Sequence, residues 1–134
     1  MIGKNNPLNI RYNRLNSWRG QTGQTKGFCD FESEFYCVRA CLYLLAKSYR
    51  RRGLLTFEQL ISAYAPPSEN KTSIYVSYVC RKLCVNRYNK PQSLSTFLFM
   101  ITYMSNMEGN PISAIKYFSE LREEFYRDFD KYCK

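Results

Sequence analysis

The chain has 134 residues, of which 45% are hydrophobic and 16% aromatic, and it contains no histidine. This length and apolar content argue against disorder and predict one domain over residues 1–134, large enough to bury a core without a metal or a disulfide. The lack of histidine excludes Ser-His-Asp and Cys-His catalysis and histidine-dependent zinc hydrolase sites. Proton transfer near neutral pH must then fall to carboxylates, Lys, Tyr or Cys.

The chain is strongly basic, with 20 Lys and Arg against 11 Asp and Glu and a net charge of +9. Such a field favours a polyanionic partner: nucleic acid, an anionic membrane surface, or a bacterial wall rich in carboxylates and phosphates. The densest basic run, 47–52, is typical of a solvated helix end, with phosphate or nucleic-acid binding as the alternative.

The amino terminus contains no apolar run of the kind found in secretory signals. The longest apolar stretch, 94–104, is interrupted by Ser95, Thr96 and Thr102 and is too short to span a bilayer. We therefore expect a protein made in the cytoplasm without a signal peptide and without stable membrane insertion. If it acts in the periplasm or on the wall, something else must carry it there.

The predicted elements begin with an irregular segment. Residues 1–31 are rich in Asn, Gly, Gln and Thr and predict loops with a short hairpin around 10–12 and 27–31. A long helix is expected over 34–52, with Ser33 as N-cap and Gly53 just past its end. A short helix then begins after Thr56, which forms a capping-box pattern with Gln59, and ends before Pro66 and Pro67.

Three more helices follow in the pattern. One is expected over 72–83, and one over 94–107 between Ser93 as N-cap and Gly109. The last is expected to start with Asn110 as N-cap and Pro111 at the first helical position, and to run to about Asp130. The sequence thus predicts a mainly α fold of the α+β type: a helical domain with a small irregular or β amino-terminal lobe.

Two cysteine pairs, Cys37/Cys41 and Cys80/Cys84, have a spacing that places each pair on one helix face. A four-thiolate zinc site between two helices is one interpretation, but structural zinc ligands more often come from tight turns. Buried free thiols are the alternative that we prefer, so we predict no metal and no cofactor.

Glu108 is the most prominent candidate for carboxylate chemistry. It ends an apolar helix directly before Gly109, where the partial negative charge of the helix terminus favours the neutral, protonated carboxyl group. Met104, Met107 and Tyr103 are positioned to desolvate it further. Such a group suits general-acid catalysis, whereas a solvated glutamate at a helix end is the plain alternative.

A succession of short motifs resembles small phage-type lytic proteins related to the lysozyme and glucosaminidase group, and covers roughly residues 3–112. The pattern departs at Leu8, Cys37 and Tyr64, where Gly, Gly and Trp are expected. The segments that carry the resemblance are Asn5-Asn6-Pro7-Leu8-Asn9-Ile10-Arg11, Trp18-Arg19-Gly20, Gly27-Phe28-Cys29-Asp30-Phe31, Arg39-Ala40, and Ala65-Pro66-Pro67-Ser68-Glu69-Asn70-Lys71-Thr72 with Tyr75.

The resemblance implies a lysozyme-like fold and a peptidoglycan-degrading enzyme without a cofactor, a lysozyme, glucosaminidase or lytic transglycosylase, with Glu108 as catalytic acid. Because the glutamate helix usually precedes the Asn-Asn segment in these enzymes, the motif order also predicts a circular permutation. Glu69 is the alternative catalytic residue, although its simpler role is to complement a helix start. The residues expected to bind substrate are Asn6, Asn9, Arg11, Asn70, Thr72 and Tyr75, with Ser68 or Asn70 as the helix cap.

The expected partners are peptidoglycan, a phage particle or secretion apparatus, and an inhibitor or immunity protein. A different class of function remains open at this point: a non-enzymatic virion or secretion-system structural protein, or a basic nucleic-acid-binding module. The sequence carries no recognised zinc finger, helix-turn-helix or RNA-binding signature that would support nucleic-acid binding.

Overall fold

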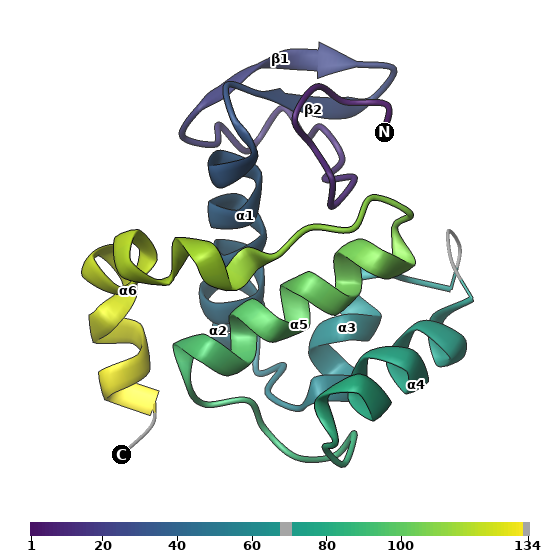
Figure 1. Ribbon diagram of the computed structural model, residues 1–134, viewed down its shortest axis with the longest axis vertical. Helices are drawn as coiled ribbons and strands as arrows, with labels where there is room; N and C mark the ends of the chain where they lie inside the picture. Colours follow the sequence, from purple (N-terminus) through teal and green to yellow (C-terminus); the bar gives the residue numbers. More distant parts are fainter. Residues whose placement is uncertain (68–70, 133–134) are drawn as a thin grey trace.

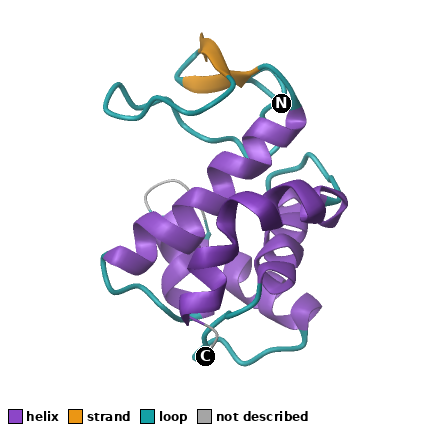
Figure 2. Cartoon of the chain, turned by 90° about the vertical axis from the view of Figure 1, so that its left-hand side faces the viewer, coloured by secondary structure: helices purple, strands orange, loops and turns teal. Residues whose placement is uncertain are grey.

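The computed structural model describes residues 1–67 and 71–132, with side chains placed as far as Phe129. A small lobe of loops and two strands lies at one end of the molecule, and the helices form the rest (Figures 1 and 2). The strands are β1 (Gln21–Thr25) and β2 (Phe28–Phe31). The helical elements are α1 (Glu34–Tyr43), the π-helical η1 (Leu44–Ser48), α2 (Tyr49–Arg51), α3 (Phe57–Tyr64), α4 (Thr72–Leu83), α5 (Leu94–Met107), the 3₁₀ turn η2 (Ala114–Tyr117) and α6 (Phe118–Tyr132). The predicted mainly α, α+β architecture is therefore confirmed.

The hairpin differs from the predicted one. β1 and β2 pair antiparallel across a two-residue turn in which Lys26 and Gly27 both have positive φ, as a type I′ hairpin requires. The segment around Ile10 contributes only an isolated bridge between Arg11 and Phe28. The prediction thus located β2 correctly and assigned it the wrong main partner, because residues 21–25 are polar and mostly exposed and lack a hydrophobic alternation.

The first long helix runs without a break from α1 through η1 into α2, and Gly53 lies just past its end as predicted. Gly53 adopts the left-handed conformation, with φ 84°. The basic run at its end is only partly solvated. Arg50 is buried, with its guanidinium stacked 4.9 Å from the Phe97 ring and 5.6 Å from the Phe129 ring. This arrangement ties α2 to α5 and α6 rather than exposing Arg50 to a ligand.

Helix boundaries in the middle of the chain match their capping chemistry. The Thr56 side chain and Gln59 form the full capping box at the start of α3. The Ser93 hydroxyl accepts a hydrogen bond from the Thr96 amide at the start of α5. The predicted caps Ser68 and Asn70 of α4 lie outside the described residues.

The prediction for the last helix was wrong at its start. Asn110 does not cap a helix, because its amide is already bonded to the Ser105 carbonyl and its side-chain amide donates to the carbonyls of Pro7 and Glu108. The chain then crosses α5 in an irregular stretch, held by the Ser105 and Thr102 hydroxyls, which accept from the amides of Ile112 and Ala114. Helix formation is thereby delayed to η2 and α6.

Helix α5 lies at the centre of the molecule and packs against α1, α4, α6 and η2. One continuous hydrophobic cluster joins it to both ends of the chain. From the amino-terminal lobe this cluster includes Leu8, Ile10 and Phe31, and from α6 it includes Leu121 and Phe125. The irregular lobe is therefore packed onto the helical core rather than appended to it.

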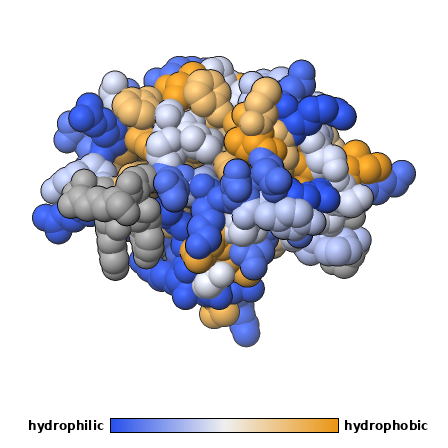
Figure 3. Space-filling model, turned by 90° about the horizontal axis from the view of Figure 1, so that it is seen from below, coloured by the Kyte–Doolittle hydropathy of each residue, from blue (hydrophilic) through white to orange (hydrophobic). Residues whose placement is uncertain are grey.

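None of the helices in the described part of the chain is long and apolar enough to cross a membrane. The face seen in Figure 3 is mainly hydrophilic, and its apolar side chains appear in separate small patches.

Candidate functional site

Glu108 is positioned by the way in which α5 ends. It is the C-cap residue, and Gly109 follows it with φ 82°. The Gly109 amide donates to the Asn106 carbonyl (3.1 Å) and the Asn110 amide donates to the Ser105 carbonyl (3.0 Å). These two bonds form a Schellman motif, which requires a residue in the left-handed conformation and so explains the glycine. The motif stops the helix abruptly and leaves the Glu108 side chain at its tip.

The amino-terminal segment reaches Glu108 through Asn9, and it contains two asparagines in unusual backbone conformations. Asn5 (φ 53°) and Asn9 (φ 52°) are both left-handed, which asparagine tolerates better than most residues. Asn9 follows a turn closed by its amide and the Asn6 carbonyl (3.1 Å). Its side-chain Nδ2 then donates to Glu108 Oε1 at 2.9 Å and to the Glu108 carbonyl oxygen at 3.3 Å.

Tyr75 of α4 holds the other oxygen of the carboxylate. Its hydroxyl donates to Glu108 Oε2 at 2.9 Å and also lies 3.3 Å from the Met104 carbonyl oxygen. Tyr75 is 2% exposed, and burial followed by the negative charge of Glu108 raises its pKa strongly, so that it stays a protonated donor. Both oxygens of Glu108 are thus held by neutral donors from distant parts of the chain.

Glu108 makes no ion pair with any residue that the structure describes. Its neighbours on the inner side are neutral: burial raises the pKa values of Cys41 and Tyr64 well above their usual range. Glu108 is consequently surrounded by neutral groups on this inner side, and the charged side chain of Arg11 lies on the side of the cleft.

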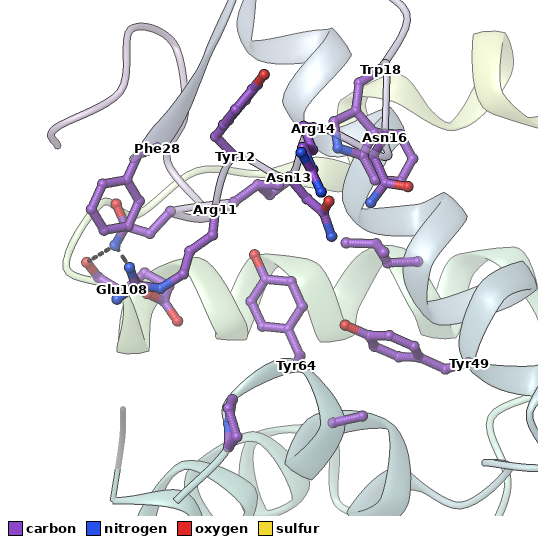
Figure 4. Close-up of a pocket in the computed structure, with 15 residues that line it drawn as sticks. Arg11, Tyr12, Asn13, Arg14, Asn16, Trp18, Phe28, Tyr49, Tyr64 and Glu108 are labelled. Atoms are coloured by element: carbon purple, nitrogen blue, oxygen red, sulfur yellow. Dashed lines mark hydrogen bonds between the residues drawn. The ribbon is translucent and has the colours of Figure 1, made fainter. Parts of the chain in front are cut away.

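A cleft of about 600 Å³ lies in front of Glu108, between the amino-terminal loop and the helical body (Figure 4). Among the described residues that line it, Glu108 is the only acid. The lining is otherwise aromatic, amide-bearing or basic: Asn9, Ile10, Arg11, Tyr12, Asn13, Arg14, Asn16, Trp18, Phe28, Leu44, Tyr49, Ala63, Tyr64 and Pro66.

Two sides of this cleft differ in character. On the inner side, the Tyr64 hydroxyl donates to the Leu8 carbonyl (2.6 Å), and burial raises the pKa of Tyr49 to about 12. On the outer side, residues 12–17 are all exposed and form what we call the rim segment. Figure 4 shows Glu108 beside Phe28 at one end of the cleft, Trp18 and Asn16 at the other end, and Tyr64 between them.

The structure brings together some of the predicted site residues. Asn9 contacts Glu108 directly, and Arg11 lines the same cleft with its guanidinium 4.8 Å from the Phe28 ring. Tyr75 lies beneath the carboxylate and does not line the cleft, so it supports Glu108 instead of facing a ligand. The predicted proximity of the amino-terminal motif to Glu108 therefore holds for Asn9 and Arg11.

Other predicted positions do not face the cleft. The prediction that Asn6 binds substrate is wrong, because Asn6 is 0% exposed and its side chain is fully engaged. Its Nδ2 donates to the carbonyls of Ile10 and Cys29, and its Oδ1 accepts from the Ile10 amide and the Cys37 thiol. Thr72 donates its hydroxyl to the Ala65 carbonyl (2.6 Å) and is not among the described cleft residues. Glu69 and Asn70 lie outside the described residues.

Sequence reasoning missed Tyr64, Tyr49 and Arg14 as cleft residues. Tyr64 occupies the place where the motif expects tryptophan, and this departure was the available signal. Arg14 and Tyr49 belong to no motif, and only the folding of the rim segment and η1–α2 around the cleft brings them together.

The cysteines do not form a metal site in the described part of the chain. Cys29, Cys37, Cys41, Cys80 and Cys84 are free thiols, and no group of three or more Cys, Asp and Glu residues is placed to hold a metal ion. Cys37 and Cys41 are buried, and burial raises the pKa of the Cys37 thiol strongly. The zinc interpretation has no support in this geometry, and Cys133 lies outside the described residues.

Comparisons with known proteins give a phage relative. The chain is 28% identical over 130 residues to "Protein P5" of Pseudoalteromonas phage PM2, an alignment that covers 92% of this chain and 78% of the phage protein. The chain matches none of the protein-family models with which it was compared.

Proposed function

We propose that the protein cleaves glycosidic bonds in the glycan strand of peptidoglycan, with Glu108 as the general acid. The observation that carries the proposal is the cleft in front of Glu108, whose two carboxylate oxygens are fixed by Asn9 and Tyr75. A carboxyl group held at a known orientation in a cleft can protonate a glycosidic oxygen as the oxocarbenium-like state develops.

The remainder of the cleft suits an amino sugar. Amide side chains of Asn13 and Asn16 offer donors and acceptors for hydroxyl and N-acetyl groups, and the Trp18 and Tyr49 rings offer apolar faces. The net charge of +9 suits a carboxylate-rich wall. Similarity to a phage protein agrees with delivery by a phage particle, after which the protein would act in the periplasm or on the wall.

Mass spectrometry of purified peptidoglycan digested by the protein is the direct test. Products with new reducing ends would show hydrolysis, and anhydro products would show transglycosylation. Glu108→Gln keeps the size of the side chain and removes the transferable proton, so cleavage should fall by at least about 10²–10⁴-fold while the fold stays intact.

Glu123→Gln is the matched control, because Glu123 is exposed on α6 and does not line the cleft. It should retain full activity. No products from the unchanged protein would reject the enzymatic proposal and favour a structural component of a phage particle. Full activity in Glu108→Gln would leave the reaction without its acid and redirect the search to Glu69.

A further inference from the structure

Arg14 is a cleft residue for which the described part of the chain supplies no partner, in contrast to several cations elsewhere on the surface. Arg39 pairs with Glu124, Lys47 with Asp128 and Arg87 with Glu58. Arg14 lines the cleft, is exposed, and makes no hydrogen bond or ion pair with any described residue. Its guanidinium donors are therefore available to a ligand in the cleft.

The backbone of the rim segment holds Arg14 in place. The Asn16 amide donates to the Asn13 carbonyl (2.9 Å), and the Asn13 side-chain oxygen accepts from the Leu15 amide (2.9 Å). These bonds form a turn that presents Arg14 near its apex. Figure 4 shows Arg14 and Asn13 on the outer side of the cleft, across from Tyr64 and Tyr49.

We propose that Arg14 binds a carboxylate carried by the glycan, so that the cleft selects acidic amino-sugar strands over neutral ones. This inference rests on the proposed function and assigns the substrate class of the same cleft. A guanidinium presents a planar fork of donors that matches a carboxylate in a bidentate pair. In peptidoglycan every second sugar bears a carboxylate on its lactyl ether or on the attached peptide, whereas chitin has none.

Arg14 is better suited to this role than the other arginine of the cleft. The Arg11 guanidinium already lies over the Phe28 ring at 4.8 Å, close to the Glu108 end where the bond is cleaved. Arg14 is farther along the cleft, so it can hold the acidic substituent of a sugar while leaving the Glu108 end to the scissile linkage. Selection and bond cleavage then belong to different parts of one groove.

Binding can be measured without cleavage in the Glu108→Gln protein. The probes are glycan strands stripped of their peptides, which retain one lactyl carboxylate per disaccharide, and the same strands after their carboxylates are converted to amides with carbodiimide and ammonia. Calorimetry should show about ten- to hundredfold tighter binding of the carboxylate form, the range of a charge-assisted hydrogen bond.

Adding Arg14→Gln should remove this preference, and Arg14→Lys should restore part of it. Arg122→Gln is the matched control, because Arg122 is exposed on α6 and its change lowers the net charge equally. Arg122→Gln should keep the preference. Equal losses in Arg14→Gln and Arg122→Gln would mean that net charge alone attracts the strand, and would overturn the assignment of Arg14.

The two proposals fail in different ways. Equal binding of the carboxylate and amide strands, or binding of neither, overturns the role of Arg14 whatever the enzyme does. Lack of cleavage by the unchanged protein rejects the proposed reaction, and an Arg14-dependent preference would then identify a binding module for acidic glycans.

Discussion

The inner segment of the amino-terminal loop (residues 5–10) and the rim segment (residues 12–17) are adjacent in sequence and opposite in character. In the inner segment, Asn6 is 0% exposed and has every side-chain polar atom bonded. In the rim segment, Leu15 is 83% exposed and Arg14 has no described partner. The first segment fixes the geometry of Glu108, and the second is left free to meet a ligand.

An asparagine-rich loop can thus perform two tasks, one in each segment. Buried polar side chains cost free energy unless they are satisfied, so a fully bonded asparagine specifies one loop conformation. Exposed polar side chains carry no such penalty and can exchange water for a ligand. Substitutions in the two segments should therefore differ in what they damage: stability in the inner segment and binding in the rim segment.

The largest effect on stability is expected from Asn6→Ala. It leaves the Ile10 amide and the Cys29 carbonyl without their partner in a buried site, whereas the Ile10 carbonyl keeps its hydrogen bond from the Cys29 amide. Each unsatisfied group costs about 1–3 kcal/mol, and because relaxation reduces the sum we expect a loss of about 3 kcal/mol in the free energy of unfolding. Urea denaturation measures it, and Asn16→Ala in the rim segment should stay within about 0.5 kcal/mol. Equal effects of the two changes would remove the distinction between the segments.

The next effect is expected from Tyr75→Phe. Removing the hydroxyl deprives Glu108 Oε2 and the Met104 carbonyl of a buried donor, at a cost of about 2 kcal/mol in unfolding free energy. Because Tyr75 orients the acid without lining the cleft, kcat for glycan cleavage should fall by about tenfold while KM is unchanged. Tyr12→Phe on the rim is the control and should alter KM if it alters anything. A change of KM alone in Tyr75→Phe would mean that the ring contacts substrate after all.

The fold was predictable where local chemistry decides it. Thr56 with Gln59, Ser93 and Gly109 mark helix ends that the structure reproduces, because capping depends on a few neighbouring residues. Asn110 failed as a cap since its amide and side chain bond to α5 and to Pro7, which lie beside it only after folding. The circular permutation stays a prediction; the ends of the described chain lie at opposite ends of the molecule and do not supply the short junction that would favour it (Figures 1 and 2).

The candidate site was predictable in part. The sequence located Glu108 and its proximity to Asn9, since both stood in recognisable motifs. It did not separate supporting residues from lining ones: Asn6 and Tyr75 were expected to face substrate and are buried instead. Burial of these side chains depends on how α4, α5 and the amino-terminal loop pack together. A sequence motif gives the residue type at each position but does not tell whether the side chain faces the core or the cleft.

The inner side should also make the protein sensitive to alkali. Burial raises the pKa values of the Cys37 and Cys41 thiols above their usual range, so the folded state keeps protons that the unfolded chain loses above about pH 8.5. The stabilising contribution is therefore complete below that pH and declines as the pH rises, by up to about 1.4 kcal/mol per pH unit for each thiol. Urea denaturation between pH 7 and 10 measures the slope. Cys41→Ala should make it shallower and exposed Cys84→Ser should not, so that equal slopes in all three proteins would assign the alkaline loss to other groups.

The smallest effect on stability comes from a matched pair of glycines. Gly109 (φ 82°) and Gly53 (φ 84°) both follow helices in the left-handed conformation, and a Cβ at either position would meet no heavy atom within 4 Å. Alanine at each site should therefore cost only the conformational penalty of about 1 kcal/mol in unfolding free energy, and thermal denaturation can compare the two variants directly.

The two alanine substitutions should differ in their effects on the cleft, because only Gly109 closes the turn that sets the Glu108 side chain against Asn9 and Tyr75. Glycan cleavage should drop several-fold in Gly109→Ala and stay unchanged in Gly53→Ala at equal stability. Equal activity in the two variants would show that Asn9 and Tyr75 hold the carboxylate without help from the helix end.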